Sequence, residues 1–405
     1  MDTLVALATK YKAPTAEIAS KMQYANSDAV AKLLQPDEPI LCFSPTALRQ
    51  QADQFLAHFP GKTAYALKAN PHPQVIKTLF SQGINTFDVA SPVEMELVKL
   101  HAPKAKIHYH NPVKSSKEIA TAYHQYGCKR FAVDHLDELT KIAEVIGGDR
   151  DIQIAVRLRL PSTATSVHDF SSKFGATKEE VVSLLREVKS LGYQPLVTFH
   201  PGSQCHDPAG WVHYLEAVAD IQHKSGVALI GLNIGGGFPA IYQGAAITPL
   251  TTIFATIKKT IRVCFGNECP PLECEPGRAL VAPSVTLLTR VKLVRRELGE
   301  IFINDGIYGS LMEANQTSLL TPQHRVLKSS KAPTQNFTVF GPTCDPLDLL
   351  PIPLELPSTI AEGDYIEFLS IGAYGSATIT KFNGYGEAEM LMVEDIRQAT
   401  PNLKA

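Results

Sequence analysis

The sequence predicts an α/β protein that consists of a (β/α)8 barrel and a C-terminal antiparallel β-barrel or β-sandwich domain. Three observations lead to this fold class. The chain has 405 residues, which is too long for one average domain but suits a barrel with an accessory domain. Short apolar segments with strand character alternate with helix-like segments through the middle of the chain. After about residue 280 the strand-like runs continue without helices between them, and Pro and Gly are frequent.

The predicted barrel strands are short and rich in Val, Ile, Leu and aromatic residues, as buried parallel strands are. About eight such segments occur, at residues 63–69, 85–91, 106–111, 130–135, 153–160, 195–200, 229–234 and 271–275. Strand and helix repeated eight times close naturally into a barrel.

The segments between these strands carry signals for helix starts. Residues 115–118 (SSKE) form a capping box, and residues 177–180 (TKEE) form a second one. In a capping box, a Ser or Thr side chain and an acid three residues later satisfy two backbone N–H groups at the first turn. Both boxes therefore predict helices between barrel strands.

The change of pattern near residue 280 also sets the expected domain boundaries. We expect residues 46–280 to form the barrel. Residues 1–45 and 281–405 are expected to form the β-rich domain. The strand-like residues 39–43 should join that domain, because a helix-like stretch separates them from the first barrel strand.

The composition excludes several classes of partner. The net charge is −2 and charged residues make up 19% of the chain, which gives no support for nucleic acid or an anionic membrane as a partner. No apolar run reaches the roughly 18 residues of a membrane helix, and the N-terminus lacks the pattern of a signal peptide. Seven irregularly spaced cysteines are typical of a reduced, cytoplasmic protein. Cys264, Cys269 and Cys274 do not have zinc-site spacing, so no metal is expected.

Polar residues stand at the ends of the predicted strands, where the side chains of a barrel meet at the active-site face. The first strand ends in YALKAN at 65–70, which contains Lys68. Burial would lower the pKa of this lysine and suit it to Schiff-base chemistry. An equally good reading places Lys68 just past the strand, exposed at the rim.

The second and fifth strands add further charges. Asp88 ends the second strand and could pair with Lys68, whereas Glu94 fits an ordinary acid at a helix N-terminus. Arg157 and Arg159 are two residues apart on the fifth strand and face the same side. Two inward arginines require an anion or a carboxylate nearby.

The last three strand ends complete the pattern. His200 ends the sixth strand, and a single histidine is more often structural than catalytic. Gly235, Gly236 and Gly237 end the seventh, where backbone N–H groups could approach a phosphate, although a flexible turn is the simpler reading.

The eighth strand ends in EPGR at 275–278, with Glu275 and Arg278. A carboxylate facing a pyridine nitrogen would keep that nitrogen protonated, and an arginine could bind a phosphate. Lysine, glycines, acid and arginine at one barrel face together predict pyridoxal phosphate.

At this point the sequence resembles the ornithine/diaminopimelate/arginine decarboxylase family, which has an alanine-racemase-like barrel, and within it the ornithine decarboxylase branch. The match covers nearly the whole chain. It is carried by YALKAN at 65–70, FDVAS at 87–91, KFGA at 173–176, FHPGSQ at 199–204, NIGGGFP at 233–239, ECEPGR at 273–278, NDGIYGS at 304–310, GPTCDPLD at 341–348 and GAYGSATITKFNGY at 372–385.

The resemblance implies roles for individual residues. Lys68 would bind the cofactor covalently, with Asp88 near it, His200 stacked on the pyridine ring and Glu275 on the ring nitrogen. Cys344 would donate a proton to Cα, and Asp345 would bind the distal amine of the substrate. The remaining cofactor-binding positions are Arg157, Ser203, Gly235, Gly236, Gly237, Gly277, Arg278 and Tyr374.

The resemblance also implies a homodimer with shared active sites, in which the Cys344 loop reaches the partner's site. Lys173 of one subunit would then pair with the Asp348 of the other. The β-rich domain would thus contribute to the dimer interface.

One departure concerns the expected substrate pocket, which Tyr308, Glu313 and Thr317 would also line. Thr317 stands where ornithine decarboxylases carry a second amine-binding Asp, and Leu311 replaces a phenylalanine. Losing a charged partner of a desolvated ammonium costs about 2–5 kcal/mol. Unless Glu313 substitutes, a preference for ornithine should be lost.

The predicted function is a pyridoxal-phosphate-dependent decarboxylation of an amino acid, either an ornithine- or lysine-like diamino acid of polyamine biosynthesis or a derivative. The alternative is a decarboxylase of a larger conjugated amino acid in siderophore, polyamine or other specialised biosynthesis. An amino-acid racemase and a non-catalytic homologue remain further alternatives. GPTCDPLD argues against the racemase, and retention of Lys68, Glu275, Arg278 and Cys344 argues against the non-catalytic homologue.

Overall fold

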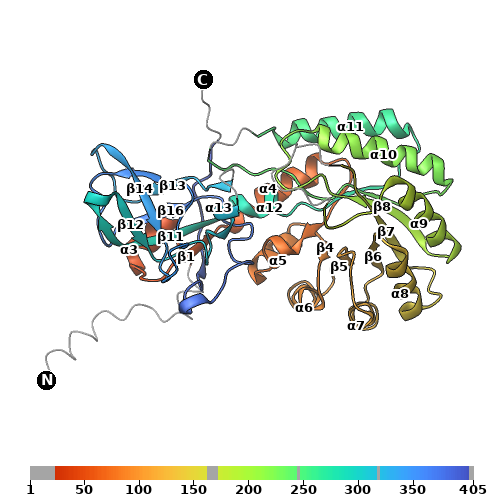
Figure 1. Ribbon diagram of the computed structural model, residues 1–405, viewed down its shortest axis with the longest axis horizontal. Helices are drawn as coiled ribbons and strands as arrows, with labels where there is room; N and C mark the ends of the chain where they lie inside the picture. Colours follow the sequence, from red (N-terminus) through yellow and green to blue (C-terminus); the bar gives the residue numbers. More distant parts are fainter. Residues whose placement is uncertain (1–22, 162–171, 244–246, 317–319, 401–405) are drawn as a thin grey trace. The chain divides into compact units, whose positions relative to one another are not determined.

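The computed structural model describes residues 23–161, 172–243, 247–316 and 320–400. The chain divides into two compact units (Figure 1). The barrel unit comprises Leu48–Ile241 and Ala245–Val281, and the sheet unit comprises Met1–Ala47, Tyr242–Gly244 and Ala282–Ala405. In the described ranges, every helix is too short or too polar to cross a membrane.

The barrel unit contains a closed parallel sheet. Its strands are β2 (Lys62–Thr63), β3 (Tyr65–Ala66), β4 (Thr86–Val89), β5 (Lys106–Tyr109), β6 (Arg130–Val133), β7 (Gln153–Leu158), β8 (Gln194–Phe199), β9 (Leu232–Asn233) and β10 (Leu272–Cys274). Their order is β2-β10-β9-β8-β7-β6-β5-β4-β3. β2 and β3 are the two halves of one strand, since β2 pairs with β10 and β3 with β4. The expected eight-stranded barrel is thereby confirmed.

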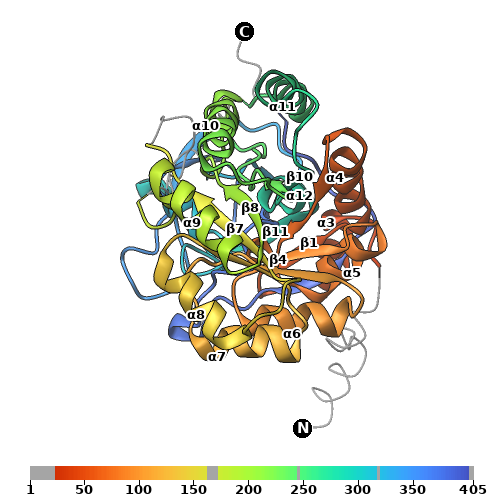
Figure 2. The same ribbon diagram turned by 90° about the vertical axis from the view of Figure 1, so that its right-hand side faces the viewer.

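Helices cover the outside of this sheet (Figure 2). They are α4 (Pro45–His58), α5 (Pro73–Ser81), α6 (Pro92–His101), α7 (Ser116–Ala120), α8 (Leu136–Ile146), α9 (Lys178–Ser190), α10 (Ala209–Ser225), α11 (Leu250–Phe265) and α12 (Arg278–Val281). Both predicted capping boxes are present: Ser115 and Glu118 cap α7, and Thr177 and Glu180 cap α9. These caps satisfy backbone N–H groups that a first helical turn otherwise leaves without partners.

An aromatic cluster anchors the glycine loop that follows β9. Phe238 stacks on Trp211 of α10 with ring centroids 4.9 Å apart, and Phe55 of α4 meets it edge to face at 5.3 Å. Phe254 of α11 closes the cluster at 5.7 Å. All four side chains are buried, so burial of their large apolar surfaces holds the loop in place.

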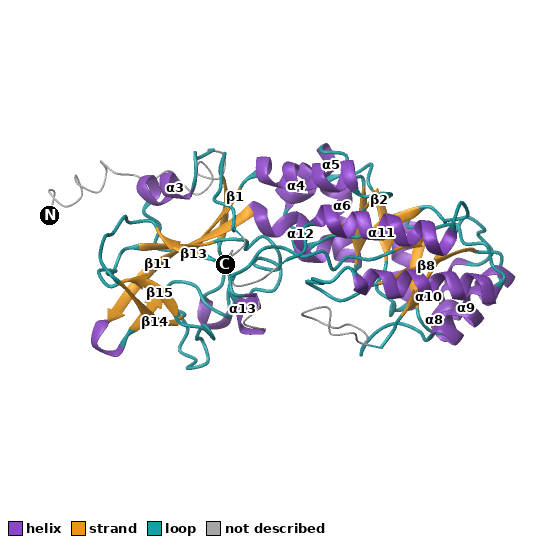
Figure 3. Ribbon diagram, turned by 90° about the horizontal axis from the view of Figure 1, so that it is seen from above, coloured by secondary structure: helices purple, strands orange, loops and turns teal. Residues whose placement is uncertain are grey.

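The sheet unit is built mainly from strands (Figure 3). They are β1 (Ile40–Phe43), β11 (Val285–Arg295), β12 (Glu300–Ile303), β13 (His324–Val326), β14 (Thr334–Phe340), β15 (Leu354–Pro357), β16 (Tyr365–Phe368) and β17 (Glu389–Met392). Among the described residues, the helices α3 (Ser27–Leu34) and α13 (Met312–Gln316) accompany them.

Pairing in the sheet unit is mostly antiparallel, as expected, and β1 joins β11 from the N-terminal side with Ile40 opposite Leu288. Two pairs are parallel, β1 with β17 and β12 with β14, so the sheet is mixed. The sequence pattern does not predict this, because alternation shows which face of a strand is buried and not the direction of its neighbour.

Candidate active site

The polar residues predicted at the strand ends do meet at the carboxyl ends of the barrel strands. Lys68 lies in a short 3-10 turn (Leu67–Ala69) directly after β3, and Asp88 lies on β4. His200 follows β8, and Glu275 follows β10. Because the strands are parallel and the sheet is closed, these ends share one face.

Lys68 is exposed in the single chain, directly after the strand. Its charge acts through space on Asp88 and Glu94. Burial and the charge of Glu275 raise the pKa of Asp88 to about 7, although His110 and Lys68 oppose this rise. Glu94 accepts a hydrogen bond from the Ala90 amide at 2.6 Å, which fits the helix-terminal role expected for it.

His200 is held as a neutral ring. Its Nδ1 accepts a hydrogen bond from the Gly202 amide at 3.1 Å. Burial and the positive charges of Lys68 and Arg157 keep the pKa of His200 well below its ordinary value. Arg157 itself is half-buried on β7, whereas Arg159 lies beyond the strand and is exposed.

The glycine run after β9 cannot carry side chains. A Cβ on Gly235 would lie 2.1 Å from the Phe199 carbonyl oxygen, and one on Gly237 would lie 2.3 Å from that of Gly202. Both glycines have positive φ, of 67° and 86°. A Cβ on Gly236 would lie 2.6 Å from the Glu275 carbonyl oxygen.

Arg278 lies beside this glycine run. Its guanidinium Nε donates to Ser203 Oγ at 3.4 Å, and both side chains are buried. The backbone at Gly277 lies close to Ala69, because a Cβ added at Gly277 would lie 2.9 Å from the Ala69 Cβ. Arg278 and Ser203 are thus adjacent, and they lie beside a loop whose close backbone contacts leave no room for a side chain.

Glu275 is part of a buried polar network that the sequence reasoning missed. Its Oε1 lies 2.5 Å from His110 Nδ1 and accepts a hydrogen bond from Asn233 Nδ2 at 2.6 Å. Asn233 also donates to Glu273 at 3.1 Å, and His108 Nδ1 lies 3.2 Å from the same oxygen of Glu273. The signal was the two-residue spacing of the histidines and of the glutamates, which places each pair on one face of a strand.

The residues expected from the sheet unit form a second group. Cys344 is exposed and its neighbour Asp345 is half-buried, and the Cys344 amide donates to Asn383 Oδ1 at 3.0 Å. The Tyr308 hydroxyl donates to Asp345 Oδ2 at 2.5 Å. Its ring packs against Phe382 with centroids 5.1 Å apart.

Of the other predicted substrate residues, Glu313 lies within the described residues and Thr317 does not. Glu313 lies in the first turn of α13 and is half-buried, and Leu311 is buried within the unit. Thr317 lies outside the described residues. Tyr374 is half-buried with a left-handed backbone, φ 62°, in which its carbonyl oxygen accepts two hydrogen bonds from Thr378.

Asp348 does not present its carboxylate at the surface. It is 1% exposed and accepts hydrogen bonds from the Ile307 amide, the Thr343 amide and the Thr343 hydroxyl, at 3.1, 3.0 and 2.8 Å. These three hydrogen bonds hold the carboxylate in a fixed orientation within the sheet unit. The expected pairing of Asp348 with Lys173 of a partner stays a prediction.

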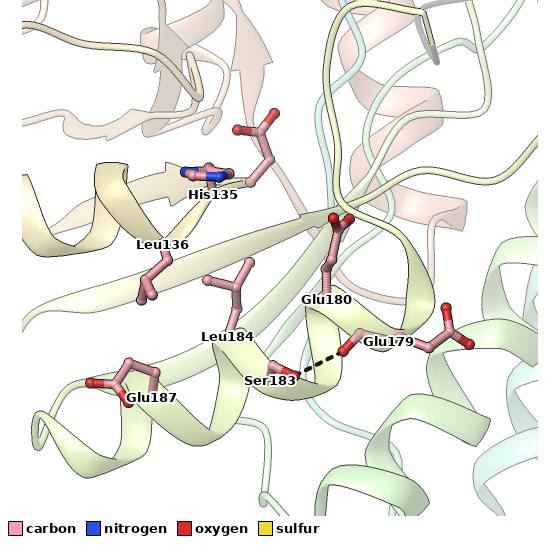
Figure 4. A pocket seen from close by; sticks show the side chains of 8 residues that line it. His135, Leu136, Glu179, Glu180, Ser183, Leu184 and Glu187 are labelled. Carbon is pink, nitrogen blue, oxygen red and sulfur yellow. Dashed lines mark hydrogen bonds between the residues drawn. The ribbon is translucent and has the colours of Figure 1, made fainter.

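A hollow of about 430 Å³ lies on the outer side of the barrel unit, between the start of α8 and helix α9 (Figure 4). It is acidic, but two of its acids, Asp134 and Glu180, have structural partners. Glu180 caps the α9 helix at Thr177, and Asp134 accepts a hydrogen bond from the Gly175 amide at 2.8 Å. None of the predicted site residues lines it.

Comparison with known proteins identifies the family to which this barrel belongs. The model of the pyridoxal-binding domain of pyridoxal-dependent decarboxylases matches residues 46–282. The chain belongs to the pyridoxal-dependent decarboxylase family. The expected pyridoxal-phosphate-dependent amino-acid decarboxylase is thereby confirmed.

Individual relatives of this decarboxylase cover most of its length. A lysine/ornithine decarboxylase of Selenomonas ruminantium is 31% identical over 366 residues, 88% of this chain and 90% of that protein. An ornithine decarboxylase of Panagrellus redivivus is 31% identical over 375 residues, 86% of this chain and 84% of that protein. The crystal structure of the Vibrio vulnificus lysine/ornithine decarboxylase with cadaverine has a TM-score of 0.79 at 30% identity, covering 91% of this chain and 98% of that one.

The residues at the barrel face of this decarboxylase fit pyridoxal phosphate. The Gly236 amide is buried and, within the described ranges, donates no hydrogen bond, which suits a phosphate acceptor. Arg278 and Ser203 add a cation and a hydroxyl beside it. Burial raises the pKa of Glu275, but the charge of His110 and its contact with the carboxylate outweigh this effect and hold that pKa below its ordinary value. An ionised carboxylate is therefore available for a pyridinium nitrogen.

Proposed function

We propose that this decarboxylase acts on an amino acid whose side chain ends in an ammonium group, or on a larger derivative of such an amino acid. The observation that carries the proposal is the half-buried carboxylate of Asp345, which Tyr308 orients. Hydrogen bonds from the Tyr308 hydroxyl and the Leu347 amide lower the pKa of Asp345 below its ordinary value. An ionised carboxylate in a fixed orientation is suited to an ammonium group.

The names of the relatives support this substrate class. The Selenomonas ruminantium protein is a lysine/ornithine decarboxylase, and the Vibrio vulnificus one was crystallised with cadaverine. Both names refer to compounds with an amine at the far end of the chain.

Each site residue has a role in the proposal. Lys68 would bind pyridoxal phosphate covalently, His200 would lie on the face of its ring, and Glu275 would pair with its ring nitrogen. Asp88 and Arg157 balance the charge around Lys68 and Glu275. The phosphate is bound by Ser203, Gly235, Gly236, Gly237, Gly277, Arg278 and Tyr374.

Bound pyridoxal phosphate supplies an electron sink for the pair released when the bond between Cα and the carboxylate breaks. The chain's own groups do the rest. Neutral His200 contacts the ring without adding a positive charge beside it. Asp345 positions the distal ammonium, and the Cys344 thiol gives its proton to Cα. The Lys68 amine would be the group that releases the product by reclaiming its own place on the cofactor.

We further propose that the protein is a homodimer with shared sites. The exposed Cys344 and the half-buried Asp345 serve the barrel face of the partner subunit. A cytoplasmic location also belongs to the proposal, because all seven cysteines are free thiols, as is usual in reducing compartments.

The test compares kcat/KM for ornithine, lysine, arginine, diaminopimelate and conjugated diamino acids, in the unaltered enzyme and in Asp345→Asn. We expect Asp345→Asn to lower kcat/KM for the preferred substrate on the order of 100-fold, because an ammonium loses its charged partner. Preference for an amino acid without a distal amine, or an unchanged kcat/KM in Asp345→Asn, would contradict the proposal. A conjugate preferred over every simple diamino acid would identify the larger derivative as the substrate.

The same panel tests the altered pocket. With Thr317 and Leu311 in place of an acid and an aromatic residue, ornithine should be a poor substrate. A kcat/KM for ornithine of about 10^4 M⁻¹s⁻¹ or more would show that this interpretation is wrong. Glu313 would then be the first candidate for the missing charge.

A further inference from the structure

The interior of the barrel holds a layer of buried charged and polar side chains that includes Glu275. His108 and His110 come from β5 and the residue after it, and Glu273 and Glu275 come from β10 and the residue after it. β5 and β10 are not neighbours in the sheet, so the contacts between these residues cross the barrel interior. Bulky aliphatic side chains usually fill this space.

Two buried carboxylates must be balanced by cations, because an unpaired buried charge is strongly unfavourable. Arg130 supplies one, since its guanidinium lies 2.8 Å from Glu273 Oε1. His108 also contacts Glu273 and does not need to be charged; burial lowers its pKa despite the charge of Glu273.

Glu275 has a different set of partners. In the described part of the chain, no lysine or arginine lies within ion-pair distance of it. Its close contacts are the neutral amide of Asn233, at 2.6 Å, and His110, at 2.5 Å. Burial lowers the pKa of His110, but the charge of Glu275, the hydrogen bond to it and the charge of Asp88 together raise that pKa above its ordinary value.

The Asn233 amide links this pair to the phosphate-binding loop. Its Nδ2 donates to Glu275, and its Oδ1 accepts from the Gly235 amide at 2.8 Å. The buried Asn233 side chain therefore fixes the positions of both the Glu275 carboxylate and the Gly235 amide. A change in the orientation of Glu275 would therefore also shift the glycine loop.

We propose that His110 is a positioning residue that holds Glu275 ionised and correctly aimed for the ring nitrogen of pyridoxal phosphate. The inference rests on the proposed assignment of Glu275 to that nitrogen. His110 gives its Nδ1 proton to the contact with Glu275 Oε1 and supplies the positive charge that no permanent cation provides at this contact. The charged or titratable groups that face His110 are Asp88 on β4, His108 on β5, Arg130 on β6, and Glu273 and Glu275 of the β10 segment.

A metal ion is the competing use of these side chains. Ligand atoms of His108, His110 and Glu275 lie within 4.8 Å of one another. Two ligands of one tetrahedral zinc ion stand about 3.3 Å apart, from bond lengths of about 2.0–2.1 Å. His110 Nδ1 and Glu275 Oε1 are 2.5 Å apart, which is too close for two ligands of one ion and fits a direct ion pair.

The test measures the dissociation constant of pyridoxal phosphate and the pH dependence of the absorbance of the bound cofactor. The variants are His110→Leu, His110→Gln and Glu275→Gln, with His108→Gln as the matched control. His108 is equally buried, lies two residues away and stacks on His110 with centroids 5.4 Å apart. Circular dichroism of each variant establishes that it is folded, and His110→Gln serves if His110→Leu does not fold.

We expect both His110 variants to weaken cofactor binding on the order of 10- to 100-fold, because Glu275 loses a charged partner in a buried site. Their cofactor absorbance should become pH-dependent near neutrality, and His108→Gln should change both quantities clearly less. Selective ¹³C labelling of histidine in the full chain should show His110 titrating above its ordinary pKa, and lower in Glu275→Gln.

Three results would overturn the inference. One is cofactor binding and absorbance unchanged in the His110 variants but altered in Glu275→Gln. Another is an equal effect of His108→Gln, which would reveal general damage to the layer. The third is one bound metal ion per chain that is lost in His110→Leu. If Glu275→Gln itself leaves binding and absorbance unchanged, the ring-nitrogen assignment fails, and the inference with it.

Discussion

The Tyr308 hydroxyl donates a hydrogen bond of 2.5 Å to Oδ2 of Asp345, across 37 positions of sequence within the sheet unit. The acceptor raises the pKa of Tyr308, and the donor lowers that of Asp345. The two residues therefore act together: Asp345 stays ionised, and its second oxygen accepts from the Leu347 amide at 2.9 Å. A carboxylate held at both oxygens has a fixed direction in which to meet a substrate.

Tyr308→Phe tests this relationship. The change removes one hydrogen bond and leaves the ring against Phe382. We expect kcat/KM for amine-terminated substrates to fall by about 5- to 10-fold, since one such hydrogen bond is worth about 1 kcal/mol. Phe382→Leu, which keeps the hydrogen bond, is the control. An equal loss in both variants would mean that ring packing, and not the hydrogen bond, matters.

Lys68 should carry the cofactor. Borohydride reduction of the loaded enzyme followed by peptide mapping should place the label on Lys68, and Lys68→Ala should lose about 10^3-fold or more in kcat. Lys62, exposed at the start of the same interrupted strand, provides the matched variant Lys62→Ala, which should keep full activity. A label on another lysine would make the assignment wrong.

Gly236→Ala should weaken cofactor binding. Its Cβ would lie 2.6 Å from the Glu275 carbonyl oxygen, so the backbone of the loop must shift. We expect a 10- to 100-fold higher dissociation constant, corresponding to a strain of about 1–3 kcal/mol. Gly148→Ala is the control, because nothing lies within 4 Å of its Cβ and its φ is not positive. Equal binding in the two variants would contradict the role of the loop.

Shared sites can be tested by mixing two inactive chains. If Cys344 serves the partner's barrel, a mixture of Lys68→Ala and Cys344→Ala chains should regain part of the activity, because a mixed dimer contains one intact site. Statistical exchange gives half of the dimers this composition, so recovery should approach about a quarter of the original activity per chain. No recovery after demonstrated subunit exchange would count against shared sites.

Asp88 should make the stability of the apo chain depend on pH. Burial and Glu275 raise the pKa of Asp88 from 3.8 to about 7, so the folded chain binds a proton that the unfolded chain releases between these values. Stability is therefore highest below pH 3.8 for this group and falls as pH rises toward 7. Asp88→Asn should reduce the difference between pH 5 and pH 8 by about 1–2 kcal/mol in urea unfolding, allowing for partial solvent screening. An unchanged difference would contradict the raised pKa.

Local sequence patterns were sufficient to predict the strands and helices of the barrel. Each segment of apolar residues contains a strand, and the capping boxes at Ser115 and Thr177 start helices, because both signals depend on residues close in sequence. Strand ends were less predictable. The segment 229–234 forms only Leu232–Asn233 of β9, since a ladder extends only as far as its neighbours provide partners.

The sequence alone was sufficient to predict the residue types of the site and their positions at the strand ends. The reason is that the carboxyl ends of parallel strands lie at one face of the barrel. The closed barrel decided which of them touch. His110 and Glu275 lie on strands that are not neighbours, and they meet only because the sheet curves back on itself. The burial of Asp348 and the exposure of Lys68 were decided in the same way. Periodicity reports which face of an element is buried, whereas charge pairing depends on distances that form only when distant segments pack together.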